Sequence, residues 1–141
     1  MSRSIRLSLT LLATAIGLTA MAGGFALVLG TVDTSNAGGI APDYAFLEGS
    51  PFTSYLVPGL LLAIVIGGLH LLAAFMLGRG SRFGPLAAAV AAFGLLIWIF
   101  VQMVFIPFGP LQAIYFVAGL GELGFVLLIL GLLHRPVLSR S

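Results

Sequence analysis

The sequence predicts an all-α protein, a four-helix transmembrane bundle with up-down connectivity and both termini in the cytoplasm. Three observations predict it: an apolar composition, four long apolar runs, and arginines that all fall on one side of the membrane. Of the 141 residues, 60% are hydrophobic and 7% are charged, whereas soluble domains carry about 25% charged residues. Such a chain cannot cover its own surface with polar groups. We therefore expect one transmembrane domain over residues 1–141, with the lipid bilayer as its solvent.

Each apolar run is long enough to cross the hydrocarbon core, which takes about 20 residues of helix. The predicted spans are residues 7–30, 55–77, 85–106 and 110–133. Pro58, Pro85 and Pro110 fall in the first turns of the last three spans, where a missing N–H costs little. Because short turns join spans two, three and four, we expect these spans to be antiparallel neighbours.

The arginines predict the orientation of the chain in the membrane. They are Arg3, Arg6, Arg79, Arg82, Arg135 and Arg140, and with four spans every one lies on the same side. The long connection over residues 31–54 has no basic residue and holds Asp33, Asp43 and Glu48. Since basic residues concentrate in cytoplasmic loops, the arginine side is predicted to be cytoplasmic and residues 31–54 to form an outer loop. The expected location is the cell inner membrane.

The first span admits a second interpretation. Arg3 and Arg6 resemble the basic start of a signal peptide, and residues 20–22 resemble a cleavage site. The apolar run nevertheless continues to Gly30, which is longer than a usual signal-peptide core. We favour retention of this segment as a helix, and the mass of the purified protein would distinguish the two.

Small residues predict which helix faces pack together, because helices in lipid associate through close backbone approach. On spans one and two, glycine and alanine recur at spacings of three and four, and the face of span two includes His70. The glycines expected to pack against neighbouring helices are Gly17, Gly24, Gly59, Gly67, Gly94, Gly121 and Gly124. Packing without any further role is the simplest interpretation of these faces.

Glu122 and His70 are ionisable residues expected near the middle of the membrane. A carboxylate at the bilayer centre costs about 2.5–3.5 kcal/mol, so Glu122 must be paired, protonated or functional. His70 lies at a similar depth on the small-residue face of span two. We expect a neutral pair with Glu122 protonated, because it keeps a hydrogen bond without burying two charges. The alternative is that each side chain bonds separately to a helix backbone.

Other polar and aromatic residues lie near the outer ends of the spans. Gln102 completes the candidate intramembrane polar site, and with Gln112 it either lines an outward vestibule or bonds across helices. Trp98 is too deep for the membrane interface and is expected to pack in the bundle, whereas Tyr55 and Tyr115 fit an aromatic belt.

Several chemistries are not predicted. The chain has no cysteine, which excludes disulfides and thiolate ligands, and His70 alone cannot supply the two histidines that a membrane haem usually needs. The acidic residues show no metal-ligand spacing. We expect no enzyme activity, no cofactor and no metal. The net charge of +2 is too small to indicate a nucleic-acid partner.

Parts of the chain resemble small uncharacterised bacterial four-helix integral membrane proteins. The matching features are Ser50-Pro51-Phe52, Pro58-Gly59, Gly67-Gly68, Trp98 and Gln102. They cover spans two to four and the end of the outer loop, and the resemblance implies the fold but no activity. Small multidrug transporters share the size and span number, but their essential glutamate lies in the first span and Glu122 lies in the fourth.

Two functions follow from these observations. The first is a non-enzymatic membrane protein that acts through helix packing, as a homo-oligomer or as an accessory subunit of a membrane protein partner. The second is a small proton-coupled transporter or channel that uses Glu122 and His70.

Overall fold

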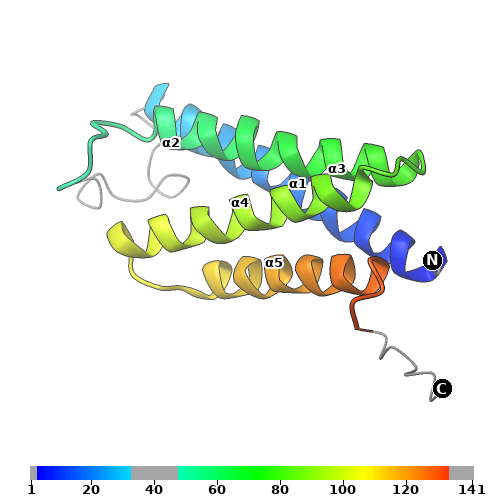
Figure 1. The fold of residues 1–141 in the computed structure, drawn as a ribbon. Helices are drawn as coiled ribbons and strands as arrows, with labels where there is room; N and C mark the ends of the chain where they lie inside the picture. Colours follow the sequence, from blue (N-terminus) through cyan, green and yellow to red (C-terminus); the bar gives the residue numbers. More distant parts are fainter. Residues whose placement is uncertain (1–2, 33–47, 134–141) are drawn as a thin grey trace, which may run out of the picture.

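The computed structural model describes residues 3–32 and 48–133, and these residues are helical apart from the turns between helices (Figure 1). The helices are α1 (Arg3–Val32), α2 (Leu56–Leu60), the π-helix η2 (Leu61–Gly67), α3 (Gly68–Gly78), α4 (Gly84–Phe105) and α5 (Pro110–Ile129). α2, η2 and α3 are continuous and form one long helix, Leu56–Gly78. Together with α1, α4 and α5 it makes four helices that are long and apolar enough to span a membrane. The prediction of four such helices is confirmed.

The helix ends differ by a few residues from those predicted. α1 begins at Arg3 instead of residue 7, because about one helical turn that carries Arg3 and Arg6 precedes the apolar run. The last helix ends at Ile129 instead of residue 133, because Gly131 takes a positive φ of 73° that ends a helix. Residues 33–47, with Asp33 and Asp43, and residues 134–141, with Arg135 and Arg140, lie outside the described part of the chain.

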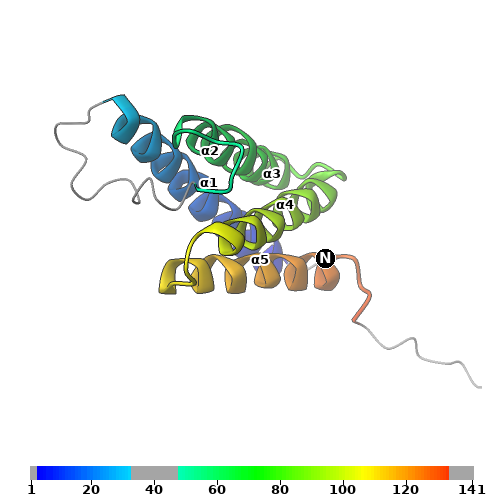
Figure 2. The ribbon, with the colours of Figure 1, turned by 90° about the vertical axis from the view of Figure 1, so that its left-hand side faces the viewer.

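The helices form a ring. α1 packs against α2, η2, α3 and α5, and α4 packs against α3 and α5. α3 and α5 therefore face each other across the bundle. In Figure 1 the start of α1, the α3–α4 turn and the end of α5 lie together at one end, here the arginine end. The end of α1, the start of α2 and the α4–α5 connection lie at the other, here the loop end. Figure 2 shows α1 diverging from α5 toward the loop end.

Glycines bring α1 and the second span into close contact. A Cβ atom at Gly24 would lie 2.5 Å from the Gly59 carbonyl oxygen, and one at Gly67 would lie 2.6 Å from Cγ of Met21. A Cβ at Gly17 would lie 2.8 Å from Leu71. Each distance is too short for a real side chain, so these backbones approach each other closely only because glycine occupies the positions.

The glycines predicted to pack on the later spans are placed differently. A Cβ at Gly94 would make ordinary contact with Leu69 at 3.7 Å, one at Gly121 would reach Leu12 only at 3.9 Å, and Gly124 has no neighbour within 4 Å of that position. The close glycine of α5 is Gly119 instead, which lies against Leu96 of α4. Among the described residues, neither Gly121 nor Gly124 makes a close backbone contact, so a packing role for these two glycines stays a prediction.

The turn between α3 and α4 is closed by hydrogen bonds at the arginine end. Gly80 has a φ of 76°, and the Ser81 N–H donates to the Met76 carbonyl at 2.9 Å, the pattern of a Schellman motif. Arg6 of α1 donates from Nε to the Leu77 carbonyl at 2.7 Å. A cation at a helix C-terminus is favourable because the carbonyls there carry partial negative charge, so Arg6 ties α1 to the end of α3.

Two clusters of buried apolar residues fill the bundle. The one nearer the arginine end contains Leu9, Ala73, Leu77, Ala88, Ala91 and Val126. The one nearer the loop end contains Ile16, Ala20, Ile66, Leu95 and Ile99. Large apolar residues also cover the outside, where for example Phe100 and Val117 are 66% and 67% exposed. An apolar outer surface of this kind suits contact with lipid and is unfavourable in water.

Candidate functional site

The structure brings His70 and Glu122 together at the centre of the bundle. His70 lies on α3, three residues after the end of η2, and Glu122 lies on α5. The His70 Nε2 and Glu122 Oε2 atoms are 3.0 Å apart, and both side chains are 0% exposed. Two helices that face each other across the ring are thus joined by their polar side chains.

The hydrogen-bond partners define how many protons the pair holds. The second ring nitrogen of His70, Nδ1, lies 2.7 Å from the Ile66 carbonyl oxygen. A carbonyl only accepts, so Nδ1 carries a proton and donates it. The bond between Nε2 and Oε2 then contains one further proton, on the imidazole or on the carboxyl group. In both cases the pair has no net charge, which avoids the cost of an isolated buried charge.

Apolar layers separate the pair from both ends of the bundle. Along the second span, His70 lies between Ile66 of the loop-end cluster and Ala73 of the arginine-end cluster. Along α5, Glu122 lies one turn before Val126 of the arginine-end cluster. The Oε1 atom of Glu122 is buried without a hydrogen-bond partner among the described residues. The pair is therefore enclosed, and one carboxyl oxygen retains unused bonding capacity.

The π-helix η2 ends three residues before the histidine. Its seven residues, Leu61–Gly67, use wider turns than an α-helix, and such segments occur frequently at functional sites. A wider turn rotates the following residues relative to an uninterrupted α-helix. Local geometry of the second span thus contributes to the direction in which His70 points.

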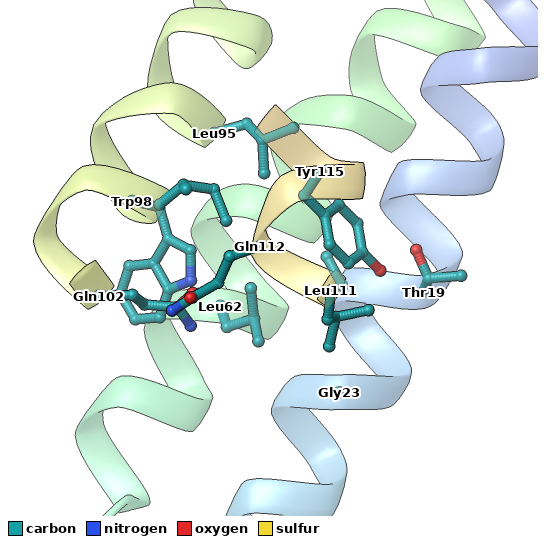
Figure 3. Close-up of a pocket in the computed structure, with 11 residues that line it drawn as sticks. Thr19, Gly23, Leu62, Leu95, Trp98, Gln102, Leu111, Gln112 and Tyr115 are labelled. Atoms are coloured by element: carbon teal, nitrogen blue, oxygen red, sulfur yellow. The ribbon is translucent and has the colours of Figure 1, made fainter. Parts of the chain in front are cut away.

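Gln102 is not part of this pair. It lines a separate apolar cavity nearer the loop end, in two joined parts of about 150 Å³ and 310 Å³. Both parts are lined by Gly23, Leu62, Trp98, Gln102 and Leu111, which come from α1, η2, α4 and α5. Figure 3 shows the smaller part, with Trp98, Gln102 and Gln112 on one side and Tyr115 with Thr19 on the other. The candidate polar residues therefore occupy two places.

Polar groups are few on the cavity wall. The indole Nε1 of Trp98 is buried and has no hydrogen-bond partner among the described residues. Gln112 accepts a hydrogen bond from the Gly109 N–H at 2.9 Å through Oε1, which closes the start of α5 and leaves the amide NH₂ of Gln112 as a donor group. The wall thus presents hydrogen-bond donors from two neighbouring helices.

The tyrosines are placed differently from the predicted aromatic belt. Tyr55 is only 3% exposed and lines the larger part of the cavity, and Tyr115 is half-buried and lines the smaller part. Their position along the chain is near the loop end, as expected. α1 and α5 separate toward this end of the bundle (Figure 2), and both tyrosines line the cavity there instead of the outer surface.

Two side chains have contacts or positions that the sequence did not predict. Arg6 was assigned only to the membrane orientation, yet its guanidinium also bonds the end of α3. Trp98 was assigned to packing, yet its N–H is an unpaired donor in a cavity. The depth of a single tryptophan in a span was a usable signal for the second, since a buried indole N–H normally finds a partner.

Among the described residues, no group of three or more histidine, cysteine or acidic side chains is placed to hold a metal ion. Comparisons with protein-family models, with curated proteins and with solved structures found no match. The fold and the site define a chain of four membrane-capable helices with a buried His–Glu pair that has no net charge and a neighbouring apolar cavity.

Proposed function

We propose that the chain is a non-enzymatic multi-pass protein of the cell inner membrane that acts by binding within the bilayer, as a homo-oligomer or as an accessory subunit of another membrane protein. The His70–Glu122 contact carries this proposal. The two side chains bond each other and are 0% exposed, so the deep ionisable groups serve the bundle itself and are closed to a substrate. The apolar outer surface supplies the area for contacts in lipid.

The proposed topology is up-down, with both termini and the α3–α4 turn in the cytoplasm. The start of α1, which holds Arg3 and Arg6, and the α3–α4 turn, which holds Arg79 and Arg82, lie at one end of the bundle (Figure 1). This agrees with the tendency of basic residues to remain cytoplasmic. Reporter fusions test it: one after Ser141 and one near Gly80 should report the inside, and one near Gly39 the outside. A reversed signal at any of the three sites contradicts the topology.

Gly121 and Gly124 favour an oligomer or a partner helix. In the described part of the chain, neither has an atom closer than 3.9 Å to its Cβ position, although small residues in lipid usually mark places where another helix approaches. We expect Gly124→Leu to leave the fold intact, because no described atom lies within 4 Å of its Cβ position, and to weaken self-association or co-purification in mild detergent.

The matched control for this experiment is Gly68→Leu on α3, which also meets no atom within 4 Å. Crosslinking in native membranes, followed by size analysis, measures the assembly of both variants. Unchanged assembly of Gly124→Leu would remove the α5 face from the proposed interface. A monomer without partners for the wild-type protein would remove the proposed role as a whole.

A proton-coupled transporter or channel is the second candidate. The Oε1 atom of Glu122, which has no hydrogen-bond partner among the described residues, favours it, because a pair without net charge that keeps a free carboxyl oxygen is able to take up another proton or a cation. Proteoliposomes with the wild-type protein and with Glu122→Gln separate the candidates. Proton flux that Glu122→Gln abolishes supports the transporter, and a wild-type protein without flux excludes it.

A further inference from the structure

We propose that the loop-end cavity binds one acyl chain of an uncharged, single-chain lipid, whose ester carbonyl accepts a hydrogen bond from Trp98 Nε1. The larger part of the cavity has a volume of about 310 Å³ and the adjoining part about 150 Å³, in the lower range of ligand pockets, which measure about 300–1,000 Å³. The inference concerns the cavity alone and does not depend on the proposed oligomer.

The side chains that line the cavity favour an apolar ligand over water. Most of the wall consists of aliphatic and aromatic side chains, such as Leu62, Leu95 and Phe105. Apolar cavities of this kind stay dry and take up apolar molecules. Leu62 and Leu111 line both parts of the cavity, so the two parts adjoin, and a ligand that fills both must extend from one into the other. An extended chain fits this shape better than a compact ring.

The buried indole N–H of Trp98, which has no partner among the described residues, favours a ligand with a hydrogen-bond acceptor at its polar end. A buried donor without a partner costs free energy, and a carbonyl oxygen from a ligand would satisfy it. The amide of Gln102 lies beside Trp98 on the same wall (Figure 3) and adds a second polar group. Since no charged side chain lines the described cavity, a charged head group would have no partner, and an uncharged ester is favoured.

The cavity is open to the surroundings of the bundle. Val101 and Leu111 line it and are 42% and 66% exposed, so part of its rim lies on the outer surface of α4 and α5. These helices are apolar and suited to lipid on that surface. A lipid chain is able to enter sideways from the bilayer without first crossing water.

Trp98 itself provides the measurement, because it is the single tryptophan of the chain. Bromine quenches tryptophan emission on contact. The wild-type protein in detergent is titrated with a monoacylglycerol that carries a dibromostearoyl chain. We expect quenching that saturates and is reversed by an excess of the same monoacylglycerol without bromine. Quenching that rises linearly and is not reversed would show partition into the micelle only, and it overturns the proposal.

Gly23→Leu is the test variant, because Gly23 lines both parts of the cavity and its Cβ position meets Leu62 only at 3.5 Å. The added side chain should occupy the ligand's place and weaken the apparent affinity by roughly tenfold or more, as extra methylenes do in apolar pockets. Gly68→Leu, with the same substitution outside the cavity, should bind as the wild type does. Equal quenching in all three proteins overturns the proposal.

Two further measurements keep the test decisive. If Gly23→Leu does not fold, Ala26→Leu fills the larger part of the cavity and takes its place. Trp98→Phe removes the donor, and mass spectrometry of the intact complex should show roughly two- to tenfold weaker retention of the unbrominated monoacylglycerol, the loss that one hydrogen bond explains. The same spectra could instead show a wild-type dimer without bound lipid and a Gly23→Leu monomer. That result would mean that a second copy of the chain fills the cavity, and it also overturns the proposal.

Discussion

A double-mutant cycle on His70 and Glu122 measures how strongly the two side chains stabilise each other, and their buried 3.0 Å contact predicts its outcome. His70→Leu and Glu122→Leu replace polar side chains by an apolar one of similar size, so the cavity contribution is small. Each single variant leaves its partner buried and unsatisfied, which costs about 1–3 kcal/mol. The lost hydrogen bond by itself accounts for less, since bonds between helices in lipid average about 0.6 kcal/mol. Most of the expected destabilisation therefore comes from the orphaned partner.

The structure also predicts an order of effects. His70→Leu leaves both oxygens of Glu122 without partners, because Oε1 has none already. Glu122→Leu leaves only Nε2 of His70 unsatisfied, since Nδ1 still donates to the Ile66 carbonyl. His70→Leu should therefore destabilise the protein more. The double variant buries no orphaned polar group, and we expect its stability to be close to that of the wild type.

The assay is the free energy of unfolding in mixed micelles, titrated with a denaturing detergent and followed by helical circular dichroism. Because each single variant should cost about 1–3 kcal/mol and the double variant close to nothing, the coupling energy between the two positions should be about 2–6 kcal/mol in magnitude. Glu122→Gln is the matched control, because its amide N–H can donate to Nε2 of His70 as a protonated carboxyl does. Additive single effects would refute the contact. A loss in Glu122→Gln as large as in Glu122→Leu would refute the neutral pair and indicate an ion pair.

Three further predictions concern other contacts. Gly24→Ala should lower the unfolding free energy by about 1–3 kcal/mol, because its Cβ would lie 2.5 Å from the Gly59 carbonyl oxygen. The control Gly68→Ala should leave the unfolding free energy unchanged, because no described atom lies within 4 Å of its Cβ position. Equal thermal stability of the two variants would contradict the close contact at Gly24. Arg6→Met should cost about 1 kcal/mol and speed amide hydrogen exchange in the last turn of α3, whereas unchanged exchange would exclude the cap. Infrared difference spectra of wild type and Glu122→Gln at neutral pH should show a protonated carboxyl band, and a carboxylate band instead would indicate a hydrated or cation-bound site.

The four helices were predictable because crossing a membrane is a property of short segments. Each span depends on the hydropathy of about 20 consecutive residues, and its ends depend on local features such as Pro85 and Pro110, which begin α4 and α5, or Gly80, which ends the turn after α3. Such features act within a few residues and need no knowledge of the neighbours.

The packing faces were only partly predictable. The stripe of glycines on α1 and the second span is close-packed at Gly24, Gly59 and Gly67, as expected. On α5 the predicted glycines, Gly121 and Gly124, make no close backbone contact among the described residues, and Gly119 lies against α4 instead. A glycine pattern shows where a backbone is able to come close, but which glycine does so depends on the rotation of the helix, and that is decided by all its neighbours together.

The sequence by itself determined the depth of the polar residues, since depth follows from position within a span at a rise of about 1.5 Å per residue. It placed His70 and Glu122 at a similar level and Gln102 farther toward the loop end. Whether they meet depends on the order of helices around the ring, and the tertiary structure decided it: α3 and α5 face each other, so the pair forms at 3.0 Å, while Trp98 and Gln102 line a cavity where α1 and α5 diverge. Hydropathy is additive along a chain, whereas a contact between residues 52 positions apart exists only when several helices pack at once.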